Sequence, residues 1–472
     1  MKSIDGNKAT GPDQIPGKLL KTCANELARV FAILFQASLD QGIVPDDWKL
    51  ALISPLFKKA DKNNVENYRP ISLTSVVCKL LEHIIHSTAM DFLDANNILT
   101  DFQHGFRQRR SCESQLIETV QDIADNLDKS SQIDAVLLDF SKAFDKVDHS
   151  TLLSKMYDIG IRESLLAWSA SFLQNRTQQV VVDGQSSDPL PVLSGVPQGT
   201  VLGPLFFLIY INDIHKNLSP GTKVRLFADD SLLYREITDI SDSQTLQKDL
   251  DTLQRWESHN KMEFHPGKCT VMRFTHKRDP ILFTYNIHGT NLDSQNSAKY
   301  LGITLDTKLD WNEHIDSVFK KACFMQSFLE RNLQKCPQNV KLTCFNALVR
   351  PILEYASCVW DPHKQTHIDR LEKIQKRAAR FITGNHIFAH GNTARNYSLL
   401  DWSPLQERRA KLKATMIFKI QNSLVEISKN RLVPSPTPRR QFNFQVPHSK
   451  LDLHKNSFFP SSIRLWNNLT DK

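Results

Sequence analysis

The chain has 472 residues, which is too long for one ordinary hydrophobic core, so we expect two or three domains. Hydrophobic residues make up 40% and charged residues 23% of the sequence, a composition that is typical of a globular protein. The net charge of +8 and the isoelectric point of about 8.9 suit a polyanionic partner, although many soluble proteins carry a similar excess.

Cysteine spacing and apolar runs exclude several classes of protein. The eight cysteines include no CxxC pair, so local spacing offers no zinc ribbon or knuckle. This usage favours a reducing intracellular compartment, the nucleus or the cytoplasm, over secretion, and the polar N-terminus does not resemble a signal peptide. The longest apolar run, residues 201–211, contains Gly203 and Pro204 and is too short to cross a bilayer, so no membrane partner is expected.

The N-terminal part is predicted to be mainly helical. Hydrophobic periodicity predicts a helix at 17–41, a strand at 50–57, and helices at 74–95 and 112–128. Lys58 and Lys59 follow the strand, and Arg69 comes after a polar loop. A lysine and an arginine on either side of a loop can clamp a triphosphate, because the guanidinium offers a bidentate fork. Without further support, two solvated cations would be the simpler interpretation.

Residues 102–111 form a compact basic and aromatic patch that includes Arg107. Such a patch suits phosphates and stacked bases. His104 lies inside it as a lone histidine, and we interpret this side chain as structural rather than catalytic.

Three aspartates stand in matching settings. Residues 135–140 are typical of a buried strand that ends in Asp139, and residues 224–234 of a hairpin with Asp229 and Asp230 at its tip. An isolated Asp-Asp pair usually marks a solvated turn, but the third acid changes the interpretation. Like charges this close repel, and a divalent cation such as Mg²⁺ can hold them together. This pattern is what two-metal phosphoryl or nucleotidyl transfer needs, with the ions about 4 Å apart.

The remaining elements follow in order. We expect a helix at 151–174, a hairpin from 180, a helix opened by 194–204 and running to about 218, a helix at 242–261, a turn and strand at 265–274, a strand at 300–303, and helices over 311–425. Small residues at 194–204 allow close approach of backbone to a ligand, and Gln198 can both donate and accept. A helix N-terminus there also favours anions.

One predicted helix, residues 370–381, is strongly two-sided. Its basic face contains Lys373, Lys376, Arg377 and Arg380. A solvated surface and a nucleic-acid backbone contact explain this face equally well. Residues 430–441 are typical of a linker, and the tail after them is too apolar to be purely disordered, although the sequence does not identify what it docks on.

The order of these motifs resembles the reverse transcriptases of non-LTR (LINE-type) retrotransposons, most closely the jockey-like group. The matching pieces are residues 11–13, 67–73, 105–107, 138–149, 194–204 and 227–230, the turn at Lys268, and residues 300–303. The resemblance covers about residues 5–425, and residues 464–467 are similar to the ends of such polyproteins. Telomerases and group II intron maturases share the same polymerase palm domain, but the residues at 194–199 and 227–230 match those of LINE elements better.

The resemblance implies an α+β fold of the right-hand polymerase type. Fingers would comprise residues 1–130, with an insertion at about 160–200. The palm, with a split βαβ sheet that carries the acids, would comprise 131–305. A helical thumb would comprise 306–425, and residues 426–472 would form a linker and a C-terminal tail.

The resemblance also implies roles for single residues. Asp139 and Asp229 would ligate two Mg²⁺ ions (Mn²⁺ being possible) with the Phe140 carbonyl assisting, and Asp230 would support the primer-side ion. The positions expected to contact the incoming nucleotide are Arg69, Lys58 or Lys59, Phe144 as steric gate under the sugar, Gln198, and Lys268 as proton donor to pyrophosphate. Spacing does not decide between Lys58 and Lys59. Asp145, Asp148 and His149 belong to the same stretch, and we interpret them as capping and structure.

The function implied is Mg²⁺-dependent RNA-directed DNA polymerisation by a mobile-element enzyme, with an RNA template, a DNA primer and dNTPs as partners. The alternative is a catalytically idle or domesticated relic that still binds nucleic acid. LINE-type polyproteins usually carry an apurinic-type endonuclease ahead of this region and often a Cys/His knuckle. This sequence contains neither, so we expect the chain by itself not to nick a target.

Overall fold

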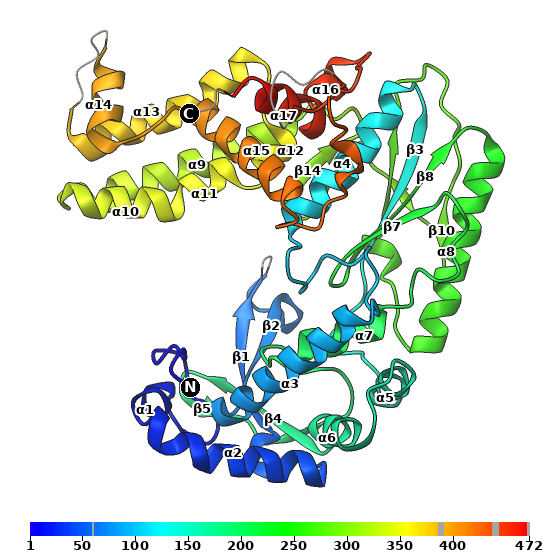
Figure 1. Cartoon of the computed structure of the whole chain (residues 1–472), viewed down its shortest axis with the longest axis vertical. Coiled ribbons are helices and arrows are strands. Elements are labelled where there is room, and N and C mark those ends of the chain that lie inside the picture. The colour runs from blue at the N-terminus through cyan, green and yellow to red at the C-terminus, as the bar shows by residue number, and fades with distance from the viewer. Residues whose placement is uncertain (59–60, 386–390, 437–442, 470–472) are drawn as a thin grey trace.

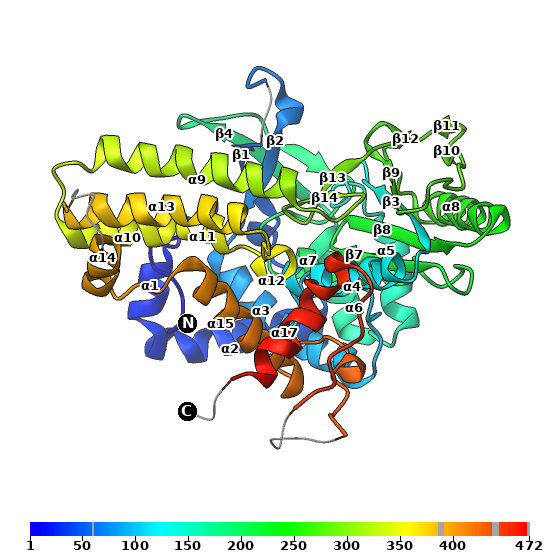
Figure 2. The ribbon, with the colours of Figure 1, turned by 90° about the horizontal axis from the view of Figure 1, so that it is seen from above.

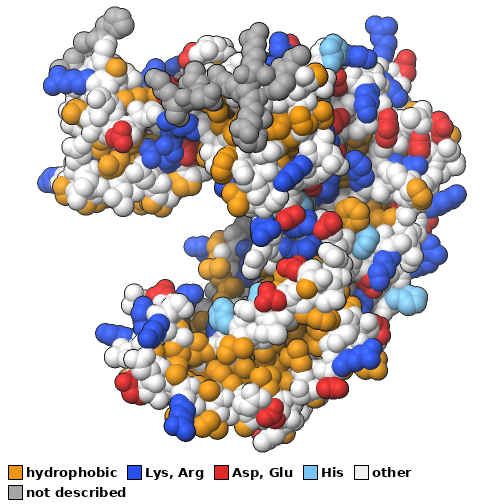
Figure 3. Space-filling view, viewed as in Figure 1, with side chains coloured by type: hydrophobic (Ala, Val, Ile, Leu, Met, Phe, Trp, Pro, Cys, Tyr) orange, Lys and Arg blue, Asp and Glu red, His pale blue; other side chains and the backbone are white. Residues whose placement is uncertain are grey.

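The computed structural model describes residues 1–58, 61–385, 391–436 and 443–469. Its elements form three regions around an open space: the first sheet with its helices, a central sheet, and a set of helices (Figure 1). We call these regions fingers, palm and thumb, after the predicted fold. The space-filling view shows that side chains do not close the gap between fingers and thumb (Figure 3). Within the described ranges, no helix combines the length and apolar composition that a membrane span requires.

The fingers contain a sheet with the order β2-β1-β4, flanked by helices. Strands β1 (Leu50–Phe57) and β2 (Tyr68–Leu73) are antiparallel, and β4 (Arg176–Val182) pairs with β1 and carries the short strands β5 (Gln185–Ser186) and β6 (Leu190–Val192). The helices are α1 (Gly17–Thr22), α2 (Ala24–Gln41), α3 (Val76–Ala95), α5 (His149–Asp158) and α6 (Glu163–Leu173). Strands β4 and β6, which lie within residues 160–200, therefore belong to the same sheet as β1 and β2.

Several helices and strands are shorter than the ranges that the hydrophobic pattern predicted. The predicted helix at 151–174 is wrong as a single helix, because Gly160 takes a left-handed φ of 99° between α5 and α6. The helix opened by 194–204 is short, α7 (Leu202–Ile211). The predicted strand at 300–303 is instead a turn, since Leu301 and Gly302 have positive φ between β13 (Ser297–Tyr300) and β14 (Ile303–Asp306). Apolar periodicity does not register such backbone reversals.

The palm sheet has the order β12-β9-β3-β8-β7. Its strands are β3 (Gln132–Leu138), β7 (Lys223–Phe227), β8 (Asp230–Ile237), β9 (Thr270–Phe274) and β12 (Asp293–Ser294). Strands β8 and β9 are joined by α8 (Ile240–Asn260), and β3 lies between them, antiparallel to both. This arrangement is the split βαβ sheet that the sequence predicted.

The palm sheet is buried on both faces. Alternate residues of β3 enter two different cores: Ile133 and Ala135 pack with α4 (Cys112–Asp128), while Val136 and Leu138 pack on the side of α8. Helix α4 also contacts β7, so it packs on the palm sheet although it precedes the predicted palm boundary. The boundary at residue 130 stays a prediction.

The thumb is helical. It consists of α9 (Asn312–Asn332), α10 (Gln338–Leu348), α11 (Arg350–Glu354), α12 (Ser357–Trp360), α13 (Gln365–Thr383), α14 (Asn392–Leu400) and α15 (Leu405–Gln421). Helix α13 packs on α9 and α15, and α12 reaches α4. The thumb and one side of the palm therefore share a single hydrophobic core.

The tail docks on α4 and α15, which answers the question that the sequence left open. Helices α16 (Asp452–Lys455) and α17 (Phe458–Asn467) contact α4, and Figure 2 shows α17 beside α4 from above. Arg431 pairs with Asp122 at 2.8 Å, and the Phe459 amide donates to Gln121 Oε1 at 3.1 Å. Of the predicted linker, residues 437–441 lie outside the described ranges.

Phe459 tests whether this docking contributes to stability. Its ring is only 1% exposed, so Phe459→Ala should lower the free energy of unfolding by about 3–5 kcal/mol through lost burial and a cavity. The measurement is denaturant unfolding, together with the rate of proteolysis in the tail. Leu469→Ala is the control, because Leu469 is 43% exposed and its truncation should change stability by less than about 0.5 kcal/mol. Equal effects of the two variants would contradict the docking.

Candidate active site

The three predicted acids meet at one end of the palm sheet. Asp139 directly follows β3, whose last residue Leu138 pairs with Ser231 on β8. Phe227 pairs with Asp230, so Ala228 and Asp229 form the turn between β7 and β8. Extending the β3–β8 register by one residue sets Asp139 opposite Asp230. Backbone pairing alone therefore brings the three residues together.

The three carboxylates influence one another electrostatically. Burial raises the pKa of Asp229, and the negative charge of Asp139 adds to this rise. Desolvation by the surrounding protein, followed by the charges of Asp229 and Asp139, raises the pKa of Asp230 to about 6. Arg69 and Lys58 act in the opposite direction on Asp229. Of the two lysines left open by spacing, Lys58 is therefore the one with a visible effect, while Lys59 lies outside the described residues.

The loop at residues 263–268 forms backbone hydrogen bonds on both sides of Phe140, just after the end of β3. The amide of His265 donates to the Asp139 carbonyl at 2.8 Å, and the amide of Ser141 donates to Glu263 at 2.8 Å. Between these two bonds, Phe140 stacks on Phe264 with ring centres 4.3 Å apart. The same loop carries Lys268, whose Nζ lies 3.4 Å from Asp139 Oδ2. The predicted lysine is thus an immediate neighbour of one acid.

Two of the predicted nucleotide contacts, Phe144 and Gln198, lie on two loops that are bonded to each other. The amide of Val196 donates to the Phe144 carbonyl at 2.8 Å, and Gln198 Nε2 donates to Asp145 Oδ1 at 3.1 Å. The Phe144 ring stacks on Phe207 of α7 at 4.4 Å. Of the residues interpreted as capping and structure, Asp148 caps α5 by accepting from the Thr151 amide.

The side chains predicted to contact nucleic acid differ in how far they are paired or buried within the chain. The guanidinium of Arg107 donates to the Thr100 carbonyl at 2.8 Å and pairs with Asp94, and that of Arg377 pairs with Glu330. Their donors are thus engaged within the chain. On the same face of α13, Lys373 is exposed, while Lys376 and Arg380 are partly buried. A contact with nucleic acid stays a prediction for all five residues.

The acids fit an open metal site rather than a closed cage. In the part of the chain that the structure describes, no group of three His, Cys, Asp or Glu side chains forms a ready-made metal cage. Mg²⁺ in phosphoryl-transfer sites is held by one or two carboxylates plus substrate phosphates, so a preformed cage is not required. Three mutually repelling carboxylates are the hard oxygen donors that this ion prefers.

One contact of the Asp229 turn escaped the sequence analysis. The side chain of Gln103, which is only 2% exposed, contacts the backbone of the Asp229 turn. Its position two residues before Gly105, inside the basic and aromatic patch, was the available signal. A glutamine without a charge or a motif of its own does not reveal a partner 125 residues away.

The raised pKa of Asp230 predicts a pH-dependent penalty on folding. Ionised Asp230 is disfavoured in the folded state, so the penalty is absent below about pH 4, grows towards pH 6 and is complete above that. With a chelator present, Asp230→Asn should stabilise the protein by about 1 kcal/mol near pH 8, allowing for solvent screening, and by nothing near pH 4. Thermal unfolding at both pH values measures this. The control is Asp183→Asn in the exposed turn between β4 and β5, and an equal gain at both pH values would contradict the carboxylate coupling.

Comparison with known proteins agrees with this geometry. Residues 57–305 match the family described as reverse transcriptase (RNA-dependent DNA polymerase). A probable RNA-directed DNA polymerase from transposon BS of Drosophila melanogaster is 30% identical over 406 residues, which are 83% of this chain and 45% of that protein. The RNA-directed DNA polymerase from mobile element jockey of the same species is 28% identical over 80% of this chain and 42% of its own length.

The chain thus spans less than half the length of these two relatives. Among solved structures, apo telomerase from Candida tropicalis aligns with a TM-score of 0.44 and 10% identity, over 86% of this chain and 73% of that one. The family match extends from the end of β1 to β14 and includes all three acids. The chain belongs to the reverse transcriptase family.

Proposed function

We propose that this chain is an RNA-directed DNA polymerase of a mobile element, which adds dNTPs to a primer 3′-OH on an RNA template. The observation that carries the proposal is the electrostatic coupling of Asp139, Asp229 and Asp230 at one end of the palm sheet, in a chain of this family. Carboxylates that repel one another carry a cost in stability, and a site that needs them for divalent ions explains why they stand together.

The residues that would hold the ions are Asp139, Asp229 and Asp230, with the carbonyl of Phe140. Two Mg²⁺ ions, or Mn²⁺ in their place, would lower the pKa of the primer hydroxyl and neutralise charge on the leaving pyrophosphate. The backbone bonds around Phe140 use the Asp139 carbonyl and the Ser141 amide, which supports a fixed orientation for the carbonyl between them.

The chain's own cations and rings would bind and orient the nucleotide. Arg69 and Lys58 would hold the triphosphate, and their effect on the Asp229 carboxylate supports a position near the acids. Lys268, 3.4 Å from Asp139, would protonate the pyrophosphate as it leaves. Phe144 would lie under the sugar and exclude a 2′-OH, with Gln198 on the template side.

Template and primer would occupy the open space between fingers and thumb (Figure 3). Arg107 and the basic face of α13, formed by Lys373, Lys376, Arg377 and Arg380, would contact the phosphate backbone. The net charge of +8 supports a polyanionic partner whose affinity falls as salt rises.

Asp229→Asn tests the mechanism in primer extension on poly(rA)/oligo(dT), with and without Mg²⁺. The substitution removes a charged ion ligand at nearly constant shape, so the rate should fall by roughly 100-fold or more, as for loss of one preorganised electrostatic contact. Asp401→Asn, at an exposed left-handed turn that asparagine tolerates, is the matched control. Extension unchanged in Asp229→Asn would reject the mechanism. Hybrid binding without any extension by the wild type would instead identify an idle relic.

Phe144→Val tests the choice of sugar. A smaller side chain leaves room for the 2′-OH, so discrimination between dNTP and rNTP should fall by roughly tenfold or more while dNTP use persists. Single-nucleotide incorporation with matched dNTP and rNTP pairs gives both efficiencies. The control, Phe418→Val on an exposed part of α15, should leave discrimination unchanged. If discrimination in Phe144→Val equals that of the wild type, Phe144 is not the gate.

A further inference from the structure

A short segment of the patch, residues 102–104, extends the palm sheet. Strand β7 is the edge strand of that sheet, and this segment lies beside it in parallel. The Leu226 amide donates to the Phe102 carbonyl at 2.9 Å, and the His104 amide donates to the Leu226 carbonyl at 2.9 Å. Backbone bonding therefore places Gln103 next to the turn that carries Asp229.

The side chain of Gln103 binds both backbone polar groups of one residue in that turn, the N–H and the C=O of Ala228. Gln103 Oε1 accepts from the Ala228 amide at 2.9 Å, and Gln103 Nε2 donates to the Ala228 carbonyl at 3.3 Å. The same oxygen accepts from the Gly105 amide at 2.8 Å. Gly105 lies so close to the Ala228 amide that a side chain at this position would overlap with it. The amide group of Gln103 is thus matched to the backbone of Ala228 and to no other residue of the hairpin.

Ala228 needs such support. Its φ of 54° lies in the left-handed region, which a residue with a Cβ adopts at a cost of about 1 kcal/mol or more. Ala228 immediately precedes Asp229, so its backbone angles set the direction in which the Asp229 carboxylate points. Asp229 and Asp230 also repel each other, and this repulsion adds to the free-energy cost of holding the turn in its conformation.

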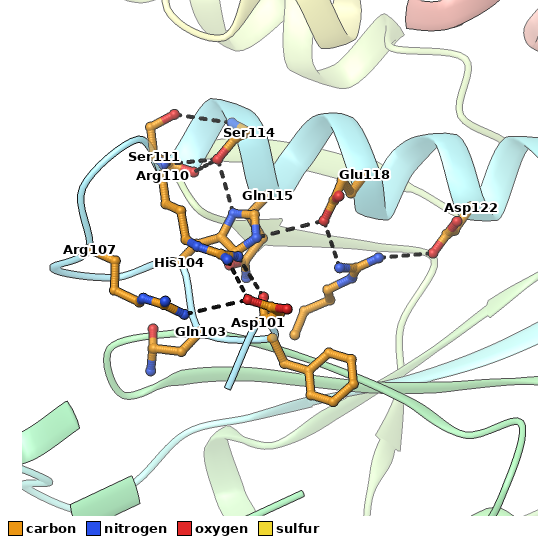
Figure 4. Close-up of polar contacts among 12 residues, drawn as sticks. Asp101, Gln103, His104, Arg107, Arg110, Ser111, Ser114, Gln115, Glu118 and Asp122 are labelled. Atoms are coloured by element: carbon orange, nitrogen blue, oxygen red, sulfur yellow. Dashed lines mark hydrogen bonds and ion pairs between the residues drawn. The ribbon is translucent and has the colours of Figure 1, made fainter. Parts of the chain in front are cut away.

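The segment itself is anchored to α4. In Figure 4 the His104 ring points towards α4, where Nδ1 lies 3.0 Å from Ser114 Oγ, while the Gln103 side chain points away from that helix. Burial and the charges of nearby arginines lower the pKa of His104 to about 3, so the ring is neutral and needs no counter-charge. Ser114 also completes the capping box of α4 with Ser111. Gln103 is therefore presented by a fixed backbone rather than by a mobile loop.

We propose that Gln103 is a positioning residue for the polymerase reaction: it holds Ala228 in the left-handed conformation and so aims the Asp229 carboxylate. The inference rests on the proposed function, because it concerns the same acids. Gln103 touches no reacting atom and acts only through the backbone of the turn. Since a misplacement of about 1 Å at a catalytic group can cost roughly 100-fold in rate, loss of this contact should appear in kcat.

Gln103→Leu tests the proposal on the full chain. Leucine has a similar volume but neither binds the Ala228 amide nor its carbonyl, so kcat should fall by roughly 10- to 100-fold. The KM for dNTP and the Kd for the RNA–DNA hybrid should change little. Hydrogen exchange at the Ala228 amide should become faster, because this N–H loses its acceptor.

Gln121→Leu is the matched control. Gln121, on α4, is likewise buried, and its Oε1 likewise accepts a backbone N–H, that of Phe459 in the tail rather than one in the Asp229 turn. A loss of kcat in Gln103→Leu no larger than that in Gln121→Leu would overturn the proposal. So would unchanged exchange at Ala228.

Gln103→Glu keeps the test decisive if the leucine variant does not fold. A carboxylate still accepts from both amides but cannot donate to the Ala228 carbonyl, and it adds a negative charge beside Asp229. Loss of the bond donated to the Ala228 carbonyl should lower kcat at the pH optimum, and the added charge should move the acid limb of the pH–rate profile to higher pH, because this side chain lies against the Asp229 turn. An unshifted profile with wild-type kcat would overturn the proposal. If the wild type itself shows no extension, the proposed function fails, and the exchange rate at Ala228 alone decides whether Gln103 holds the turn.

Discussion

Repulsion among Asp139, Asp229 and Asp230 is the constraint on which the rest of the structure depends. Each acid is fixed by backbone rather than by its own side chain: Asp139 ends the central strand, and Asp229 and Asp230 close the adjacent hairpin. A flexible chain would relax such crowding by moving the charges apart. The palm resists this because β3 is paired on both sides and buried on both faces.

Helix α4 transmits this support to the C-terminal part of the chain. Its Asp122 forms ion pairs with three cations: Lys223 and Arg225 of β7, and Arg431 of the tail. Burial alone would raise the pKa of Asp122. The charges of Lys223 and Arg225 outweigh this effect and hold that pKa below its usual range. Strand β7, which leads into the Asp229 turn, and the tail are therefore bound to the same carboxylate. A tail that lies outside the family match is in this way part of the support of the palm.

The sequence predicted those parts of the fold that depend on local pattern. The strand at 50–57 was confirmed at its stated bounds, and the hairpin with Asp229 and Asp230 at its tip was confirmed as β7 and β8. The predicted helix at 151–174 failed, since the apolar spacing of α5 and α6 continues across Gly160 while the backbone does not. The docking of the tail was beyond prediction, because pairs such as Arg431 with Asp122 join residues 309 positions apart and leave no periodic trace.

The same contrast holds for the candidate site. Asp139, Asp229 and Asp230 were predicted because three acids stand in matching strand-end settings, and Lys268 because its turn resembles one in the family; the structure brings these four residues together. Gln103 was missed because its role lies in an amide group that fits another backbone, and neither its charge nor its spacing signals this. Residues that act by chemistry can be read from a sequence more readily than residues that act by geometry.

The residues proposed to contact the nucleotide and the three acids are connected through backbone bonds and ring contacts rather than lying on independent surfaces. The Ser72 amide of β2 donates to the Gln198 carbonyl at 2.7 Å, which ties the loop at 194–199 to the finger sheet that also carries Arg69. The Val196 amide ties the same loop to Phe144, and the Phe144 ring meets the edge of Phe106 at 6.2 Å. Phe106 follows the Gly105 that lies against Ala228, so the chain leads back to the Asp229 turn. The finger sheet, the Phe144 loop and the Asp229 turn are therefore joined by a continuous series of backbone bonds and ring contacts.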